Sequence, residues 1–380
     1  MKNGIHLSPE EMARYSRHIA IPEFNIAGQQ KLKAARVLVI GSGGLGSPLL
    51  LYLAAAGVGH LGIVDFDVVD ESNLQRQVLF TVDDVGQSKS ETAKRRLEAL
   101  NPYIDIKVYN TMFTKDNALE LIKDYDVVAD GTDNFPTRYL VNDACVLAGK
   151  VNVYASIFRF EGQVSVFNYP DENGGRGPNY RDLFPEPPPP GLVPNCAEGG
   201  VLGVLPGIIG SLQASEVIKV VTGVGEPLSG RLFLFDAASF TTRTLKVTKN
   251  PNTKIEALIN YEQFCGIAPA EEQEAVKEIS VQDFQQLQET GADFQLIDVR
   301  EPYEYDIANL RGKLIPLGQI GGAAALIARD KQVIVHCRSG KRSADAIREL
   351  QSLYGFDNLY NLSGGILAYS KEIDQSLPTY

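Results

Sequence analysis

Short apolar runs and helical patterns alternate along roughly the first 157 residues. The run RVLVI at 36–40 is of the buried-strand type, and SPLLLYLAAAG at 47–57 predicts a helix that closes at Gly57. Further strands are predicted at 61–67, 104–109, 126–129 and 151–156, and further helices at 88–100, 115–123 and 136–149. This alternation is typical of a mostly parallel sheet with helices on both faces, so the predicted fold class is α/β.

A different pattern follows after about residue 157. Residues 162–169 and 231–247 alternate in the manner of antiparallel strands. Between them lie a loop rich in proline and glycine at 170–194 and a helix around 207–222. The parallel sheet is therefore expected to continue into antiparallel strands.

The N-terminal segment has its own helix signal. The residues SPEE at 8–11 have the form of a capping box with proline at the first helical position. The spacing of Arg14 and Arg17 then places both side chains on one face of the predicted helix.

The C-terminal hundred residues form a second pattern of alternating elements. An acidic stretch at 266–278 has little apolar periodicity and predicts a linker. After it, helices are predicted at 281–288 and 343–353, and strands at 294–299 and 332–336. We therefore predict two domains, at residues 1–265 and 279–380, joined by a linker at 266–278.

Composition narrows the class of protein. The chain is 44% hydrophobic and 22% charged, which favours sizeable cores over disorder. Its net charge of −11 opposes nucleic-acid binding. Neither a signal peptide nor an apolar stretch of the roughly 20 residues that a membrane helix needs is visible. Four scattered cysteines do not suit a disulfide framework, so we expect a soluble, cytoplasmic protein.

A glycine-rich loop after the first predicted strand indicates a nucleotide. GSGGLG supplies Gly41, Gly43, Gly44 and Gly46 in the pattern G-x-G-x-x-G, and Asp65 and Asp67 follow about 20 residues later, at the end of the next strand. Such a loop places phosphates at a helix N-terminus and a carboxylate on a ribose. Taken alone, the loop favours a dinucleotide such as NAD or FAD.

The polar residues that follow favour ATP instead. SNLQRQ supplies Asn73, Arg76 and Gln77, and GQSK supplies Lys89 at a helix start. Attack on an α-phosphate with loss of pyrophosphate needs several cations, whereas hydride transfer needs few. Asp133 in GTDN is a carboxylate suited to Mg²⁺. None of the four histidines stands where a dehydrogenase needs its general acid or base.

The order and spacing of five motifs support this interpretation. RYSRHI, GSGGLG, VDFDVVDESNLQRQ, GQSK and GTDN together resemble the MoeB/ThiF adenylyltransferase family, relatives of the ubiquitin-activating enzymes, over about residues 8–265. The resemblance implies a Rossmann-like fold and a homodimer that uses ATP to convert the C-terminal Gly-Gly carboxylate of a ubiquitin-like protein into an acyl-adenylate. By this resemblance Asp65 would bind the ribose and Asp133 would bind Mg²⁺. The phosphates would be bound by Asn73, Arg76 and Lys89. Arg17 would reach into the active site of the partner subunit. Without the resemblance, Arg17 would belong to a solvated helix face.

The loop at 179–200 resembles the family's crossover loop but departs from it at the zinc site. Family members usually hold a structural zinc with two Cys-x-x-Cys pairs, and the corresponding positions here are Asn179, Asp182, Glu262 and Cys265. One thiol out of four ligands does not favour zinc, so we expect no zinc and apolar packing in its place.

Of the three cysteines in the first domain, one is a candidate for a chemical role and two are not. Cys196 stands in PNCAEGG, before a glycine-rich entry to a helix that would favour a thiolate. The family resemblance makes Cys196 a candidate acceptor of the activated acyl group; the alternative is a small buried hydrophobe. Cys145 and Cys265 are expected to be ordinary thiols.

The second domain carries a cysteine in an anion-binding loop. Cys337 follows the predicted strand at 332–336 and begins the sequence CRSGKR, which supplies Arg338, Ser339, Gly340, Lys341 and Arg342. The N–H groups of such a loop stabilise a thiolate or a persulfide anion. Tyrosine phosphatases place the arginine six positions after the cysteine, where this chain has Ser343, so the shorter loop suits a sulfur atom better than a phosphoryl group.

This loop, with DVRE at 298–301 and NLSGGILAY at 361–369, resembles the rhodanese sulfurtransferases over residues 278–380. The fused arrangement resembles bacterial adenylyltransferase/sulfurtransferase proteins of molybdopterin, thiamin or cysteine synthesis. It implies that a persulfide on Cys337, loaded by thiosulfate or a cysteine desulfurase, converts the adenylated carrier into a thiocarboxylate. Two alternatives stay open: a scaffold that binds a ubiquitin-like protein without activating it, and an NAD-linked oxidoreductase with a sulfur-binding domain.

Overall fold

The computed structural model describes residues 5–171, 174–188, 200–266 and 276–378. The chain forms two compact units, at residues 1–269 and 270–380. Most of the stretch at 266–278, predicted to be a linker, lies outside the described residues. In the part of the chain that is described, no helix is both long and apolar enough to cross a membrane.

The first unit is built on one eight-stranded sheet. Its strands are β1 (Arg36–Ile40), β2 (His60–Val64), β3 (Asp105–Tyr109), β4 (Val127–Asp130), β5 (Val151–Phe158), β6 (Glu161–Phe167), β7 (Arg231–Asp236) and β8 (Thr241–Lys246). Their order is β3-β2-β1-β4-β5-β6-β7-β8, parallel from β3 to β5 and antiparallel from β5 to β8. The predicted α/β class and the predicted change of pattern near residue 157 are both confirmed.

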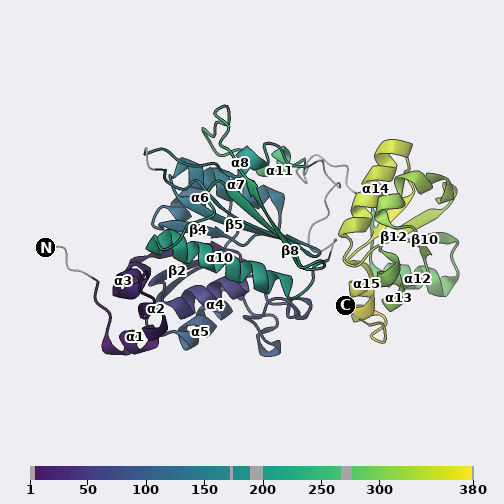
Figure 1. Ribbon diagram of the computed structural model, residues 1–380. Helices are drawn as coiled ribbons and strands as arrows, with labels where there is room; N and C mark the ends of the chain where they lie inside the picture. The colour runs from purple at the N-terminus through teal and green to yellow at the C-terminus, as the bar shows by residue number, and fades with distance from the viewer. Residues whose placement is uncertain (1–4, 172–173, 189–199, 267–275, 379–380) are drawn as a thin grey trace. The chain divides into compact units, whose positions relative to one another are not determined.

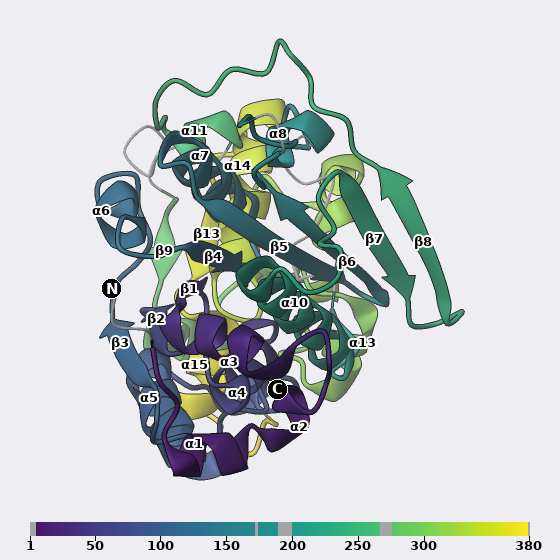
Figure 2. The ribbon, with the colours of Figure 1, turned by 60° about the vertical axis from the view of Figure 1, so that its left-hand side comes forward.

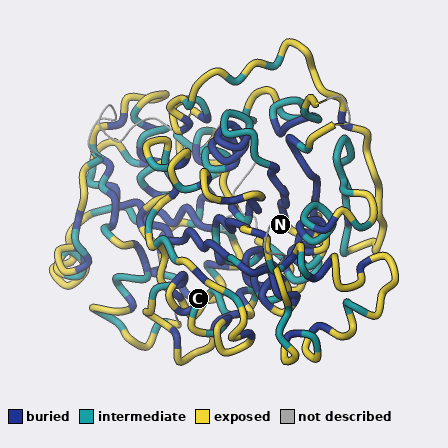
Figure 3. Tube along the Cα trace, turned by 90° about the vertical axis from the view of Figure 1, so that its left-hand side faces the viewer, coloured by how far each residue is buried: buried dark blue, intermediate teal, exposed yellow. Residues whose placement is uncertain are grey.

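Helices cover both faces of this sheet (Figure 1). One face carries α3 (Asn25–Ala34), α4 (Gly46–Ala56), α5 (Lys89–Leu100) and α10 (Leu205–Thr222); the other carries α6 (Ala118–Ile122), α7 (Phe135–Leu147), α8 (Tyr180–Leu183) and α11 (Tyr261–Phe264). Alternate residues of β1 pack into the hydrophobic cores on the two faces of the sheet. Val37 and Val39 pack against the first group of helices, and Leu38 and Ile40 pack against the second. Figure 2 shows α10 lying along β5 and β6, and in Figure 3 long buried stretches of the trace lie between exposed ones.

The N-terminal helix is shorter than predicted. The capping box of Ser8 and Glu11 starts α1 (Pro9–Arg14) as expected, but the chain then turns and Arg17 lies on α2 (Ser16–Ile19). Tyr15 separates the helices, with its ring buried against Gly57 and its hydroxyl accepting a hydrogen bond from Asn101 at 2.9 Å. The prediction that Arg14 and Arg17 share one helix face is therefore wrong, because a contact distant in sequence fixes Tyr15.

The second unit is a smaller five-stranded parallel sheet. Its strands are β9 (Glu278–Ile279), β10 (Phe294–Asp298), β11 (Lys313–Leu314), β12 (Gln332–His336) and β13 (Leu359–Leu362), in the order β11-β10-β12-β13-β9. The helices are α12 (Val281–Thr290), α13 (Pro302–Ile307), α14 (Lys341–Tyr354) and α15 (Gly365–Glu372). α14 packs on one face, and α12 and α15 pack on the other. Helix α14 begins at Lys341, slightly earlier than predicted.

An ion pair with little exposure joins α8 to α7, next to the positions expected to correspond to the family's zinc ligands. Arg181 of α8 donates two hydrogen bonds to Asp143 of α7, at 2.8 and 2.7 Å, and Asp143 also accepts from the Tyr261 hydroxyl of α11 at 2.8 Å. The guanidinium lies over the rings of Tyr139 and Phe264, at 5.0 and 4.6 Å from their centroids. The predicted apolar replacement for zinc is thus incomplete, since the region also relies on a charged pair inside an aromatic cage.

The four predicted zinc positions have other roles in the structure. Asn179 and Asp182 cap α8, with the Asn179 N–H donating to Asp182 Oδ2 at 2.8 Å. Glu262 lies in the first turn of α11. Cys265 is buried, and burial raises the pKa of its thiol to about 11. Among the described residues, no group of three or more Cys, His, Asp or Glu side chains could hold a metal ion.

Removing Arg181 should therefore destabilise the first unit. We expect Arg181→Met to lower the free energy of unfolding by about 3 kcal/mol, because the Asp143 carboxylate stays buried without its cation. Lys94→Met is a control, since Lys94 pairs with Glu98 at 3.8 Å on an exposed face, and it should change stability by less than about 0.5 kcal/mol. Urea unfolding followed by circular dichroism measures both. Equal stability of the two variants would contradict a role for the buried pair.

Candidate active sites

The first candidate site lies where the order of the parallel strands reverses. β1 lies between β2 and β4, so the chain leaves β1 toward one side of the sheet and later returns to its other side. The carboxyl ends of neighbouring strands at such a point border a crevice. The structure has an open cleft of about 1000 Å³ there, including the solvent at its mouth. Its lining includes the predicted residues Gly41, Gly43, Gly44, Asp65, Asp67, Arg76, Lys89 and Asp133.

The glycine-rich loop depends on two glycines for its shape. Gly41 has φ +88°, a backbone conformation that side chains other than glycine rarely adopt. Gly46 begins α4, and a Cβ there would lie 2.0 Å from the carbonyl oxygen of Gly41. Gly46 therefore serves the close approach of loop and helix rather than the cleft lining, while Gly43 and Gly44 face the cleft.

Asp65 connects this loop to the next strand. Its Oδ2 accepts hydrogen bonds from the backbone N–H and the hydroxyl of Ser42, both at 2.7 Å, and its Oδ1 accepts from the Asp67 N–H at 2.9 Å. The side chain lines the cleft although the residue is only 8% exposed. A carboxylate held in this way keeps a fixed orientation, which suits the recognition of a sugar hydroxyl.

The cations at the cleft come from two different elements. Lys89 is the first residue of α5, after the capping Ser88, and its ammonium lies 3.0 Å from Asp67 Oδ2. Arg76 also lines the cleft and donates to the Ser72 carbonyl at 3.2 Å. The buried Lys89 thus has a fixed position, and the partly exposed Arg76 has a looser one.

Two residues that were predicted to belong to the first site lie outside the lining of the cleft. Asn73 ends the 3₁₀ helix Glu71–Asn73 outside the cleft lining, where its carbonyl accepts from the backbone N–H groups of Arg76 and Gln77. Arg17 is exposed on α2 and also lies outside the lining. Asp133, by contrast, is an exposed carboxylate at the cleft.

The sequence analysis missed two polar residues, one at the end of β4 and one in the turn that follows it. Asp130 is fully buried, and its Oδ1 accepts from the backbone N–H and the hydroxyl of Thr132, at 3.0 and 2.6 Å. Burial raises the pKa of this carboxyl above its usual value. The signal was present in the sequence, since Asp130 directly precedes GTDN, but only the structure shows that it holds the turn that presents Thr132 and Asp133 to the cleft.

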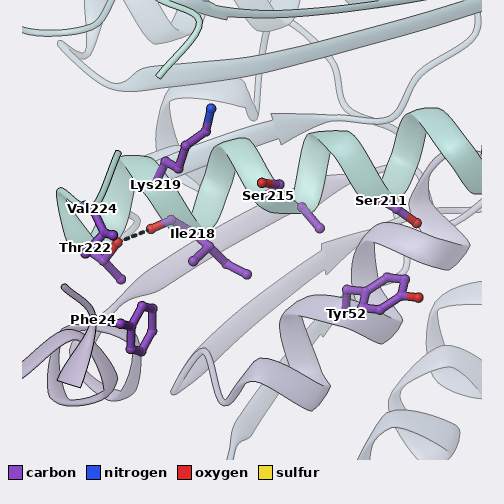
Figure 4. Close-up of a pocket in the computed structure, with 9 residues that line it drawn as sticks. Phe24, Tyr52, Ser211, Ser215, Ile218, Lys219, Thr222 and Val224 are labelled. Atoms are coloured by element: carbon purple, nitrogen blue, oxygen red, sulfur yellow. Dashed lines mark hydrogen bonds between the residues drawn. The ribbon is translucent and has the colours of Figure 1, made fainter. Parts of the chain in front are cut away.

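A second cavity of the first unit lies between α10 and the elements that carry Phe24 and Tyr52 (Figure 4). Its lining is mostly apolar, with the hydroxyls of Ser211, Ser215 and Thr222 at its edge. The lining cation, Lys219, forms an ion pair with Glu216. This cavity lacks the combination of glycine loop, carboxylates and cations that distinguishes the cleft.

The second unit places Cys337 directly after its central strand, β12. Backbone N–H of Gly340 donates to Sγ at 3.2 Å, and the Ser343 hydroxyl lies 3.4 Å from Sγ. Gly340 has φ +94° and is the last residue before α14. The residue Cys337 is 1% exposed, so its sulfur lies at the base of a tight loop.

The loop's charged side chains differ in their surroundings. Arg342 donates two hydrogen bonds to the carboxylate of Glu304 on α13, both at 2.7 Å. Burial acts to raise the pKa of Glu304, but the hydrogen bonds from Arg342 and the Glu301 backbone outweigh it and hold that pKa below its usual value. Lys341 is exposed, and Arg338 is half-buried. Arg342 is therefore tied to the scaffold, a partnership that the sequence analysis did not predict.

A fully buried ion pair holds α13, the helix that binds Arg342, against the end of β10. Arg300 donates to the two carboxylate oxygens of Asp298 at 2.9 and 2.6 Å and to the Ala308 carbonyl at 2.7 Å, and neither charged side chain is exposed. The pair fastens the end of β10 to α13, the helix that carries Glu304. DVRE at 298–301 thus acts in the structure as a support for the cysteine loop.

Cys145 and Cys265, which the sequence predicts to be ordinary thiols, are buried. Burial raises the pKa of both thiols, that of Cys265 to about 11 and that of Cys145 further. Cys196 lies outside the described residues.

The burial of His336 predicts that the stability of the second unit depends on pH. His336 is fully buried, its Nε2 lies 3.5 Å from Asp298 Oδ2, and burial lowers its pKa to about 4. An unfolded histidine titrates near 6.5, so between these values the unfolded chain binds a proton that the folded chain does not. We therefore expect the free energy of unfolding to fall by about 3 kcal/mol as the pH drops from about 6.5 to about 4.

The variant His336→Gln should lose this contribution to the pH dependence while keeping a polar side chain of similar size. Urea unfolding at several pH values, followed by circular dichroism, compares the two proteins. The same acid slope in the variant would mean that His336 does not cause it.

Comparison with known proteins assigns each unit to a family. Residues 15–257 match the model of the ThiF family, and residues 280–372 match that of the rhodanese-like domain. A Mycobacterium tuberculosis protein named "Probable adenylyltransferase/sulfurtransferase MoeZ" is 50% identical, over 98% of this chain and 96% of its own length. The mouse protein "Adenylyltransferase and sulfurtransferase MOCS3" is 42% identical, over 98% of this chain and 88% of its own.

Further similarities concern the first unit. A Thermus thermophilus "Sulfur carrier protein adenylyltransferase" is 51% identical over 68% of this chain and 98% of its own length. The solved structure of Escherichia coli MccB with AMPCPP and MccA shares the fold, with a TM-score of 0.56 and 23% identity over 64% of this chain and 73% of that one. The chain belongs to the ThiF family and is an adenylyltransferase and sulfurtransferase, with a rhodanese-like domain after its ThiF domain.

Proposed function

We propose that this enzyme adenylylates the C-terminal Gly-Gly carboxylate of a ubiquitin-like sulfur-carrier protein with ATP, and then converts it into a thiocarboxylate with sulfur from a Cys337 persulfide. The observation that carries the proposal is the presence of two distinct sites on one chain. One is a cleft with a glycine loop, fixed carboxylates and two cations; the other is a cysteine loop whose N–H group points at the sulfur. The names of the relatives agree with both activities.

In the first reaction, a carboxylate oxygen of the carrier attacks the α-phosphorus of ATP, and pyrophosphate leaves with the electron pair of the broken P–O bond. Lys89 and Arg76 offset the negative charge that the phosphates bring together. Asp65 holds the ribose, and Asp67 keeps Lys89 in place. Asn73 and Arg17 keep their expected roles, toward the phosphates and toward the site of a second subunit, as parts of the same proposal.

Mg²⁺ fits this site through one protein ligand. Magnesium in nucleotide sites is usually held by one or two carboxylates together with phosphate oxygens and water. Asp133 supplies an exposed carboxylate at the cleft, as such a site requires. When bound, the ion offsets charge on the phosphates.

In the second reaction, the terminal sulfur of a Cys337 persulfide anion attacks the acyl carbon and AMP leaves, which joins Cys337 to the carrier through an acyl disulfide. A thiolate then attacks Sγ of Cys337, and the carrier leaves as a thiocarboxylate anion, while Cys337 stays in a disulfide with that thiol until a reductant releases it. Cys196 is the proposed thiol. Thiosulfate or a cysteine desulfurase loads Cys337, and the enzyme works as a cytoplasmic homodimer in molybdopterin, thiamin or cysteine synthesis.

The cleft cations can be tested with one charge removal and one matched control. We expect Lys89→Met to slow ATP-dependent pyrophosphate release in the presence of a Gly-Gly carrier by about 10²- to 10³-fold, because a fixed cation is lost where charge accumulates. Lys94 lies on the same helix but outside the cleft lining, where it pairs with Glu98, so Lys94→Met should keep the rate. Equal rates for Lys89→Met and the unchanged enzyme would remove Lys89 from the mechanism.

The sulfur step can be separated from the first reaction by mass spectrometry of the carrier. With ATP, Mg²⁺, thiosulfate and a reductant, the enzyme should replace one carboxylate oxygen of the carrier by sulfur. Cys337→Ser should abolish this exchange and leave pyrophosphate release unchanged, since it removes only the sulfur-carrying atom. Cys265→Ser is the control, because that thiol is buried and its pKa is raised. A thiocarboxylate formed by Cys337→Ser would refute the role of Cys337, and an unchanged carrier mass with no pyrophosphate release from any carrier would favour the scaffold.

A further inference from the structure

A side-chain hydroxyl next to the sulfur of Cys337 has three possible hydrogen-bond acceptors. Ser343 is fully buried in the first turn of α14. Its Oγ lies 3.4 Å from Cys337 Sγ, 2.6 Å from Asn361 Oδ1 and 3.1 Å from the Gly340 carbonyl oxygen. A hydroxyl has one proton and donates to one acceptor at a time. The direction of this O–H bond therefore depends on which neighbour is the strongest acceptor.

Asn361 is held so that its oxygen faces Ser343. Its Nδ2 group donates to Glu278 Oε1 at 2.8 Å, which leaves Oδ1 on the side of the hydroxyl. Glu278 is in turn held by the Ser363 hydroxyl at 2.7 Å. The short 2.6 Å distance makes Asn361 the preferred acceptor while the cysteine sulfur is neutral. A thiolate changes this preference, because hydrogen bonds to ionised acceptors are about twice as strong.

We infer that Ser343 is a catalytic residue of the sulfur-transfer reaction, whose hydroxyl donates to Cys337 Sγ when the sulfur is a thiolate and to Asn361 when it is not. This inference rests on the proposed function of Cys337 as the carrier of the transferred sulfur. The Gly340 N–H is fixed by the backbone and points at the sulfur in both states, whereas the Ser343 hydroxyl responds to the charge on the sulfur.

The charge on Sγ changes in each half of sulfur transfer from thiosulfate to cyanide, a reaction that needs no carrier protein. During loading from thiosulfate, the thiolate forms a bond to the outer sulfur, the sulfur–sulfur bond of thiosulfate breaks, and sulfite leaves with the electron pair. The negative charge then resides on the terminal sulfur of the persulfide. When cyanide takes that sulfur from the protonated persulfide, thiocyanate and a proton are released and the electron pair returns to Sγ. Ser343 stabilises Sγ as the nucleophile of the first half and as the leaving group of the second.

The test measures the alkylation of Cys337 by iodoacetamide in the full-length enzyme as a function of pH, with peptide mass spectrometry as the readout. Ser343→Ala should raise the pKa of the thiol by about one unit, since a hydrogen bond to the charged form is lost. Ser343→Thr keeps a hydroxyl and should restore the profile. Ser370→Ala is the matched control, because Ser370 is another buried serine of the same unit and its hydroxyl donates to the Leu377 carbonyl.

A second variant should shift the alkylation profile of Cys337 in the opposite direction. Asn361→Ala removes the competing acceptor, so the hydroxyl should donate to the sulfur more often and the pKa of Cys337 should fall. General damage to the loop would move both variants in the same direction, and that result would overturn the inference. An unchanged alkylation profile in Ser343→Ala would overturn it as well.

Alkylation also separates this inference from the proposed function, because it needs no sulfur donor. We expect Ser343→Ala to lower kcat for sulfur transfer from thiosulfate to cyanide about tenfold near pH 7 with an unchanged KM for thiosulfate. If the unchanged enzyme transfers no sulfur from thiosulfate while Ser343→Ala still shifts the alkylation profile, thiosulfate fails as the donor and Ser343 stands as the stabiliser of the thiolate.

Discussion

Parallel strand pairing places the carboxyl ends of neighbouring strands at one edge of a sheet, and both candidate sites depend on this constraint. In the first unit, the ends of β1, β2 and β4 bring the glycine loop, Asp65 and the turn before Asp133 to one cleft. In the second, the end of β12 carries Cys337 into the turn before α14. Each site thus combines a strand end with a helix start, where N–H groups are available to an anion.

Each unit contains an ion pair with little or no exposure to solvent. The Asp298 and Arg300 side chains are fully buried in the second unit, and the Asp143 and Arg181 side chains are 2% and 13% exposed in the first. Such pairs seldom add stability over a well-packed apolar cluster. They do fix direction, because a guanidinium bound to two carboxylate oxygens has one orientation. In the first unit, the hydrogen bonds of Arg181, Asp143 and Tyr261 join α7, α8 and α11.

The sequence predicted those parts of the structure that follow from local rules. The strand at 36–40, the helix ended by Gly57 and the helix capped by Ser88 depend on neighbours in the chain, and all three were found. The misses depend on distant contacts. Tyr15 interrupts the first helix because it packs on Gly57 and meets Asn101, and Arg342 binds Glu304, which lies 38 positions away. Motifs named the residues of both sites, but not the partner Glu304 that orients Arg342.

The burial of Cys337 also bears on how its sulfur survives in a cell. A thiolate in open solvent is oxidised by peroxide to sulfenic and then to irreversible sulfinic and sulfonic acids. The sulfur of a residue that is 1% exposed can be approached only through the mouth of its loop. A persulfide, however, extends about 2 Å farther than the cysteine sulfur, toward the mouth of the loop. The loop therefore shields the permanent sulfur atom of the enzyme, and oxidative damage would fall first on the atom that each catalytic cycle replaces.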